Sequence, residues 1–244
     1  DRFRYNDFPV NQMFGIQSNL PNFMAQTHQV NNATDAENFI KRLDLFPQQF
    51  TQVLEGLKLR EEKGVIPPKF TVDKVVEQMN GFIAMPASQN MLYTSFSESL
   101  DKLDADKIDE AAKEKLLASV ESSIQTSVYP AYRDLIAYFT ALQTKATENQ
   151  GAWSLPDGEE YYAWAVRSHT TTDMTPEQVH ELGLAEVGRI SAEMDAILIA
   201  QGLVEGKVGE RVQQLARKPE QIYPNTPEGK AAMIAEYQAI LDDI

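Results

Sequence analysis

Hydrophobic side chains recur every three or four residues over most of this chain, which is the spacing of amphipathic helices and not of strands. The longest such run, over residues 108–145, predicts one long helix that is kinked near Pro130. A second run after Thr34 predicts either a helical hairpin or one bent helix, with the break at Pro47. We therefore expect a mainly α fold, an irregular array of long, partly kinked amphipathic helices with at most a short strand or hairpin.

The helix that follows Thr175 has the clearest boundaries. Thr175 can cap its N-terminus, Pro176 suits the first helical position, and Gln178 can close a capping box. Gly202 offers a cap at the other end. Its apolar positions recur at helical spacing and predict burial on one side: Val179, Leu182, Gly183, Val187, Ile190, Met194, Ile197 and Leu198.

Two glycines, Gly183 and Gly188, lie inside this predicted helix. Each lowers helix propensity by about 1 kcal/mol relative to alanine. We expect close packing against another element to explain at least one of them.

The other helix boundaries depend on shorter signals. Thr34 and Thr71 are expected to cap helices, and Gly81 is expected to end the second of these. Residues 65–70 contain a Pro-Pro pair that favours extended backbone. The helical pattern weakens over residues 82–103, so we interpret residues 91–96 as a short strand or an irregular connection. Any strand should lie in one of these two pieces.

The first 32 residues differ from the rest, because they are rich in Asn, Gln, Phe and Pro and show little periodicity. We expect residues 1–32 to be an irregular, packed segment with a short helix near residues 11–20, and residues 33–244 to be the helical body of a single region, 1–244. The chain begins without Met and stops at Ile244 within an apolar pattern. We therefore expect a trimmed part of a longer product.

Composition excludes several classes of partner. The chain has 36 acidic and 22 basic residues and a formal net charge of −14, so neither nucleic acid nor an anionic membrane is an expected partner. No run approaches the roughly 18 apolar residues of a transmembrane helix. The absence of cysteine excludes disulfides and thiolate metal sites, and it suits an oxidising envelope compartment as well as the cytoplasm.

Metal-binding patterns in the chain are incomplete. His180-Glu181 matches the start of H-E-x-x-H, in which two imidazoles on one helical face bind zinc. Position 184 is Leu, so the second imidazole is missing, and His28 has no second ligand nearby in sequence. We expect no metal ligand and no catalytic residue in this chain.

The best candidate for a functional cluster surrounds a polar connection between two predicted helices. Arg167, His169 and Thr171 can present a guanidinium, an imidazole and a hydroxyl to one cleft. Tyr161 and Tyr162 can add phenol donors that position a peptide carbonyl. These five residues are the candidate substrate-binding residues. In the alternative interpretation, Arg167 and His169 only stabilise the C-terminal end of a helix, where the helix dipole favours cations.

Several motifs also carry a family resemblance that spans nearly the whole chain. They are N-Q-M-F-G-I at 11–16, R-L at 42–43, G-V-I-P-P at 64–68, Y-P-A-Y at 129–132, L-P-D-G-E-E-Y-Y-A at 155–163, R-S-H-T-T-T at 167–172 and T-P-E-Q-V-H-E-L-G-L-A-E-V at 175–187. Together they resemble the bacterial family catalogued as domain of unknown function 885. Members of that family resemble largely helical zinc metallopeptidases, in which an H-E-x-x-H helix and a more distal Glu ligand lie C-terminal to the region present here.

The resemblance implies that this chain is the N-terminal part of a larger peptidase-like protein. It would hold no cofactor itself, whereas zinc is expected in the full-length protein. The implied partners are the C-terminal catalytic portion of the same protein and a peptide substrate. The implied location is the bacterial cell envelope or periplasm, with lipid anchoring through a removed N-terminus, although the composition fits the cytoplasm as well.

Two functions are therefore open. In the first, the chain forms one wall of the substrate cleft of a zinc-dependent peptidase-like hydrolase and is catalytically silent alone. In the second, it is a non-catalytic helical binding or structural module of the bacterial cell envelope. An H-E-x-x-H motif downstream in a longer product favours the first, and a natural stop near Ile244 favours the second.

Overall fold

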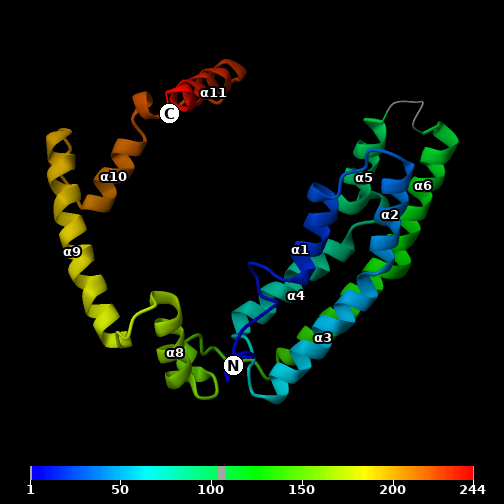
Figure 1. Cartoon of the computed structure of the whole chain (residues 1–244), viewed down its shortest axis with the longest axis horizontal. Helices are drawn as coiled ribbons and strands as arrows, with labels where there is room; N and C mark the ends of the chain where they lie inside the picture. Colours follow the sequence, from blue (N-terminus) through cyan, green and yellow to red (C-terminus); the bar gives the residue numbers. More distant parts are fainter. Residues whose placement is uncertain (1, 104–107, 244) are drawn as a thin grey trace. The chain divides into compact units, whose positions relative to one another are not determined.

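The computed structural model describes residues 2–103 and 108–243, and every regular element within them is a helix (Figure 1). The predicted mainly α fold is therefore confirmed. The chain divides into two compact units, Asp1–Ala165 and Val166–Ile244. The expectation that they serve as a single region of a longer protein stays a prediction.

The first unit is built from helices α1 to α7 and most of α8. Short π-helical turns at Phe23–Thr27 and Ile124–Val128, and 3-10 turns at Ala87–Gln89 and Ala152–Ser154, connect some of them. The helices are α1 Ile16–Asn22, α2 Ala33–Asp44, α3 Phe46–Glu62, α4 Lys69–Ala84, α5 Met91–Asp101, α6 Glu110–Ser123, α7 Tyr129–Leu142 and α8 Gly158–Thr170.

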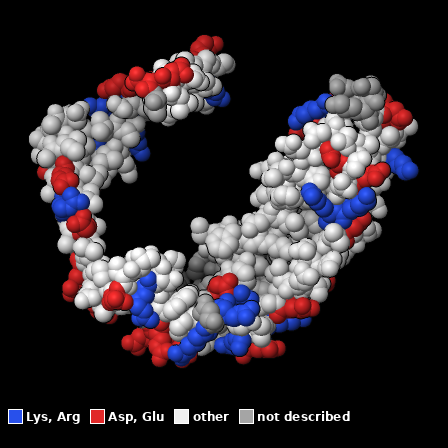
Figure 2. All heavy atoms as spheres, in the orientation of Figure 1, with Lys and Arg blue, Asp and Glu red and all other residues white. Residues whose placement is uncertain are grey.

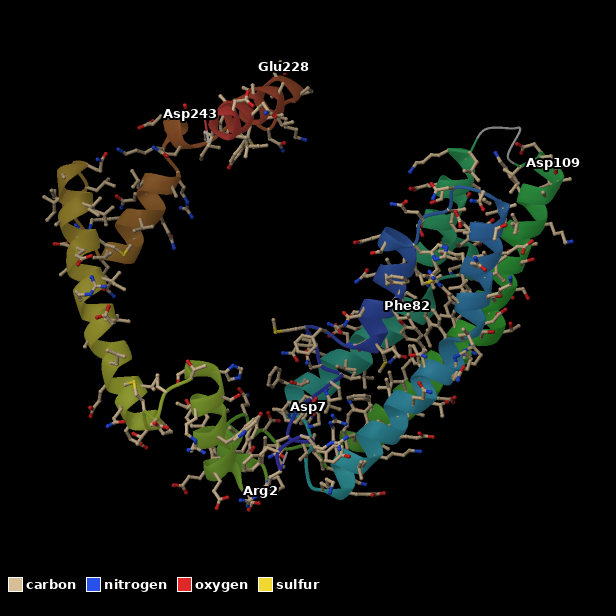
Figure 3. All side chains as sticks on the ribbon, viewed as in Figure 1. Arg2, Asp7, Phe82, Asp109, Glu228 and Asp243 are labelled. Carbon is tan, nitrogen blue, oxygen red and sulfur yellow. The ribbon has the colours of Figure 1, made fainter. Side chains whose placement is uncertain are left out.

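Helix α7 is central to the core of the first unit, where it packs against α3 and α4. Tyr132 of α7 is fully buried, with its ring centroid 4.9 Å from that of Phe50 on α3 and 4.5 Å from that of Phe82 on α4. Figure 3 labels Phe82. Phe39 and Phe96, whose ring centroids are 4.8 Å apart, join α2 to α5. Aromatic side chains bury large apolar areas, so these contacts contribute strongly to the cohesion of the unit.

The long helix expected over residues 108–145 is present as α6, a π-helical turn and α7 in direct succession. Pro130 is the second residue of α7, and it cannot donate a hydrogen bond to the carbonyl of Thr126. A widened turn is one way for a helix to accommodate this loss. The interruption near Pro130 therefore takes the form of a π-helical turn.

Asparagine residues cap the N-termini of two helices, α2 and α5, whose starts were not predicted correctly. The interpretation of residues 91–96 as a strand or connection is wrong, because they begin α5, and Asn90 accepts a 3.1 Å hydrogen bond from the N–H of Leu92. Asn32 caps α2 in place of Thr34. In α5, burial on one face overrides the strand propensity of the segment. The residues of that face are Leu92, Phe96 and Leu100.

Helix α4 also begins and ends elsewhere than expected. Its N-terminal cap position is Pro68, whose backbone is extended, so Thr71 lies inside the helix and is buried. The helix continues past Gly81 to Ala84, so the predicted stop does not form. No strand forms within residues 65–70, although Pro68 has the extended backbone that was predicted. In the first 32 residues, the short helix expected near residues 11–20 is present as α1, which begins and ends later than expected.

The second unit contains α9 (Pro176–Ala200), α10 (Val208–Ala216), a 3-10 turn (Pro219–Gln221) and α11 (Pro227–Asp242). The capping box predicted at the start of α9 is confirmed. The N–H of Gln178 donates to Oγ1 of Thr175 at 3.3 Å, and the N–H of Thr175 donates to Oε1 of Gln178 at 2.9 Å. Gly202 has a φ of 76° and ends α9, as predicted.

Helix α10 packs against one side of α9. Leu198 of α9 and Arg211 of α10 are both buried. The Arg211 guanidinium donates hydrogen bonds to the carboxylate of Asp195 and, at 3.1 Å, to the carbonyl of Leu203. One arginine therefore connects α10 to α9 and to the turn that follows α9.

The expectation that close packing explains a glycine of α9 is wrong within the described chain. A Cβ atom added at Gly183 or Gly188 would meet no other atom within 4 Å. The two glycines therefore lie beside open space. No helix in the ranges 2–103 and 108–243 is long and apolar enough to cross a membrane.

Candidate functional site

The start of α8 is held in a tight turn. Asp157 has a φ of 52°, a conformation that Asp adopts more easily than most residues. Gly158 follows at the first position of α8, where a Cβ atom would lie 2.2 Å from the carbonyl oxygen of Ala152. The sequence Leu-Pro-Asp-Gly therefore places the first turn of α8 directly against the 3-10 turn before it.

The N-terminal segment fastens this end of α8. Arg2 forms ion pairs with Asp157, at 2.7 Å, and with Glu160 (Figure 3). The hydrogen bond to Asp157 is the largest cause of a raised pKa at Arg2, which keeps the guanidinium charged. The ring of Phe3 packs against Tyr161 and Trp164, with centroid distances of 5.6 and 5.7 Å. The first residues of the chain thus orient the aromatic face of α8.

A pocket of about 340 Å³ opens in the first unit beside Tyr161. Two of its polar side chains already have partners, since the Asp7 carboxylate pairs with Arg60 at 2.6 Å and the Asn11 amide donates to a backbone carbonyl at 2.9 Å. The Tyr161 hydroxyl forms no hydrogen bond with any described residue. Tyr161 is one of the residues that line the pocket. Other residues that line the pocket are Asn6, Phe14, Ile66 and Leu155.

The remaining candidate residues lie on the surface of α8 or just after it. Tyr162, Arg167 and His169 are exposed, and Arg167 and His169 belong to the last turn of the helix. Their side chains form no hydrogen bond or ion pair with the described part of the chain. Thr171 follows with a φ of 55°, and its hydroxyl donates to the Thr170 carbonyl at 2.7 Å.

Helix geometry separates these candidates along α8. Tyr162 and His169 are seven residues apart, so they share a face of the helix but lie about 10 Å apart along its axis. Tyr161 points instead to the contact with Phe3. The helix therefore does not bring the five residues to one point, and both the substrate-binding and the helix-dipole interpretations of Arg167 and His169 stay predictions.

Three residues that line the pocket were not predicted from the sequence, namely Asn6, Asp7 and Asn11. The available signal was the Asn-rich composition of the first 32 residues, which indicated a packed segment without saying which side chains would face α8. The contacts of this segment span some 150 positions of sequence, as in the hydrogen bond from Asn6 to the carbonyl of Pro156 at 3.4 Å.

The three histidines belong to different units, His28 to the first and His169 and His180 to the second. His180 is exposed on α9, with Leu184 one turn further on. His28 is half-buried, contacts Arg42 through Nδ1, and packs edge-on against Phe39 with a centroid distance of 5.2 Å. Within residues 2–103 and 108–243, no three His, Cys, Asp or Glu side chains are grouped closely enough to hold a metal ion. The expectation of no metal ligand in this chain stays a prediction.

Figure 2 shows acidic and basic side chains interspersed on the face drawn, without a continuous basic surface. The chain as a whole has a formal net charge of −14.

Comparison with known proteins establishes the family. The chain belongs to the family described as "Bacterial protein of unknown function (DUF885)", whose model matches residues 2–244. A search of curated proteins gives no match. Among solved structures, the chain is similar to "the putative lipoprotein from Colwellia psychrerythraea", with 28% sequence identity and a TM-score of 0.88. The match covers 97% of this chain and 40% of that chain, so this chain spans less than half the length of its solved relative.

Proposed function

We propose that this chain forms one wall of the substrate cleft of a longer, zinc-dependent peptidase-like hydrolase of the bacterial cell envelope. By itself the chain is catalytically silent. Zinc ligands and the catalytic base belong, in this proposal, to a part of the longer protein outside the 244 residues.

The observation that carries the proposal is the pocket beside Tyr161. Its aromatic and aliphatic lining suits a side chain of a peptide, and a phenol without a described partner suits a peptide carbonyl. The ion pairs of Arg2 and the packing of Phe3 hold α8 in place, so the phenol is presented on a fixed helix. Family membership and the lipoprotein description of the solved relative support the envelope location.

The test uses the longer protein and a set of peptide substrates. We expect Tyr161→Phe to raise KM about 2- to 12-fold with little change in kcat, because one neutral hydrogen bond contributes about 0.5–1.5 kcal/mol to binding. Tyr93→Phe is the matched control, since Tyr93 is half-buried in the first unit and its hydroxyl has no described partner.

Two outcomes would contradict the proposal. One is unchanged kinetics for Tyr161→Phe, Arg167→Gln and His169→Asn alike, which would place the substrate elsewhere. The other is a longer protein that cleaves no peptide under any metal condition, which would favour the non-catalytic envelope module. Hydrolysis by the 244-residue chain alone would contradict its assignment as a silent wall.

A further inference from the structure

Within the second unit, helix α9 carries an apolar face that the other described elements of that unit leave uncovered. Val187, Ile190 and Ile197 are 64%, 44% and 61% exposed, and they recur with Gly183 at helical spacing. Gly183 lies on the same face with open space above it. We call these four residues the α9 face.

Two sides of α9 flank this face, and further exposed apolar residues lie elsewhere on the helix, namely Leu182, Leu184 and Ile199. On one side, Leu198 is buried against α10, and Asp195 pairs with Arg211. On another side, Arg189 pairs with Glu186 and Glu193, both at 2.7 Å, and forms a polar border. The α9 face lies between a packed side and a charged border, which is the arrangement of a contact surface rather than of scattered exposed residues.

Helix α11 also carries an exposed apolar face. Ile234, Tyr237 and Leu241 are 63%, 62% and 65% exposed and share one side of the helix; we call them the α11 face. The buried residue of α11 is Gly229, which approaches the carbonyl of Pro224. Helices in proteins obtain most of their stability from packing of such a face, so α11 requires a cover that the other described elements of the second unit do not supply.

We propose that the α9 and α11 faces are covered by the remaining part of the same polypeptide in the longer protein. The match to the solved relative covers 97% of this chain but only 40% of the relative's chain. The relative therefore contains more than enough additional polypeptide to cover both faces. The inference rests on the proposed function only in assuming a longer protein, and it requires neither zinc nor hydrolysis.

The chemistry of the faces favours this occupant. The α9 face presents branched aliphatic side chains, and the α11 face presents aliphatic side chains and one aromatic, Tyr237, which suits a permanent apolar contact. Gly183 permits a backbone to approach closely, which explains a glycine that otherwise weakens α9. An anionic membrane surface is a poor match for a chain with a net charge of −14.

The chain contains no cysteine, so single cysteines can report the exposure of each face. Ile190→Cys and Tyr237→Cys place a thiol on the α9 and α11 faces. Ala192→Cys and Ala239→Cys are the matched controls, because each is exposed and lies on the opposite side of the same helix. Each variant is made in the 244-residue chain and in the longer protein, and the alkylation rate at that position is followed by peptide mass spectrometry.

We expect Ile190→Cys and Tyr237→Cys to react at least tenfold more slowly in the longer protein than in the 244-residue chain, while the two controls change less than threefold. Equal rates in both proteins would overturn the proposal. Protection that appears in the 244-residue chain as its concentration rises would overturn it in favour of a second copy. Protection that requires added lipid vesicles would overturn it in favour of a membrane surface.

A stability measurement gives an independent readout. Gly183→Leu should leave the thermal midpoint of the 244-residue chain unchanged or higher, because the position is open, and should lower the midpoint of the longer protein by several degrees. Ala192→Leu is the control and should not lower either midpoint. A Gly183→Leu variant of the longer protein as stable as its parent would contradict a close approach at this glycine. Activity enters neither measurement, so failure of the proposed hydrolase function would leave both results interpretable.

Discussion

The hydroxyl of Tyr132 donates a 2.6 Å hydrogen bond to the backbone carbonyl of Gln17, and both residues are buried. In an α-helix this carbonyl would accept from the N–H of residue 21, which is a proline inside α1. The phenol on α7 therefore supplies a donor that α1 lacks. The Tyr132 hydroxyl therefore supplies the missing hydrogen bond at Gln17 and links α1 to α7 within the first unit.

We predict that Tyr132→Phe lowers the free energy of unfolding by about 1–3 kcal/mol, because it leaves a buried carbonyl without a donor. Urea denaturation followed by circular dichroism measures the change. Tyr93→Phe removes a hydroxyl without a described partner and should remain within about 0.5 kcal/mol of the parent. Equal losses in the two variants would show that the Tyr132 hydrogen bond is not specifically required.

Alkaline pH should destabilise the first unit. Burial raises the pKa of Tyr132 above its ordinary value of 10.0, and burial followed by the nearby charge of Glu61 raises the pKa of Tyr138. Above pH 10 the unfolded chain loses phenol protons that the folded chain retains, so stability is fully present below this pH and falls as the pH rises, by at most about 1.4 kcal/mol per pH unit per phenol.

Denaturation midpoints between pH 9 and 11.5 test this expectation. Tyr132→Phe should show a shallower decline than the parent over this range, although it starts from a lower stability. A parent protein whose midpoint does not change up to pH 11.5 would contradict the assignment.

Two glycines should respond in opposite directions to alanine. Gly158→Ala forces a Cβ atom against the carbonyl of Ala152, and we expect a loss of about 1–3 kcal/mol. Gly81→Ala, in an open position within α4, should gain about 0.5–1 kcal/mol. Paired denaturation curves provide the comparison, and a Gly158→Ala variant as stable as Gly81→Ala would argue against the tight turn before α8.

The capping box of α9 should contribute measurably to the local stability of the helix start. Thr175→Ala is expected to cost about 0.5–2 kcal/mol in local stability, because the N–H of Gln178 loses its acceptor. Hydrogen exchange of the first-turn amides of α9 reports this directly. Ser191→Ala, within the same helix, removes a hydroxyl that has no described hydrogen bond and should not speed exchange in the first turn.

The sequence alone determined the features that depend on neighbouring residues. The capping box of Thr175 and Gln178 and the glycine end of α9 at Gly202 both formed where they were predicted. Each of them depends on backbone groups within four or five residues, so the local sequence contains all the atoms involved. The helical class follows for the same reason, from a spacing that is visible in any window of the chain.

Tertiary structure decided the rest. Residues 91–96 became helical because Leu92 and Phe96 are buried on one face, which strand propensity could not foresee. The donor for the Gln17 carbonyl comes from a residue 115 positions away, and the pocket beside Tyr161 is lined in part by residues within 6–14. At least one of Gly183 and Gly188 was expected to be packed, but both lie open, because the neighbour of a glycine in space depends on contacts that helical spacing does not specify. Periodicity shows that a face is apolar, and only the positions of the other elements show what covers it.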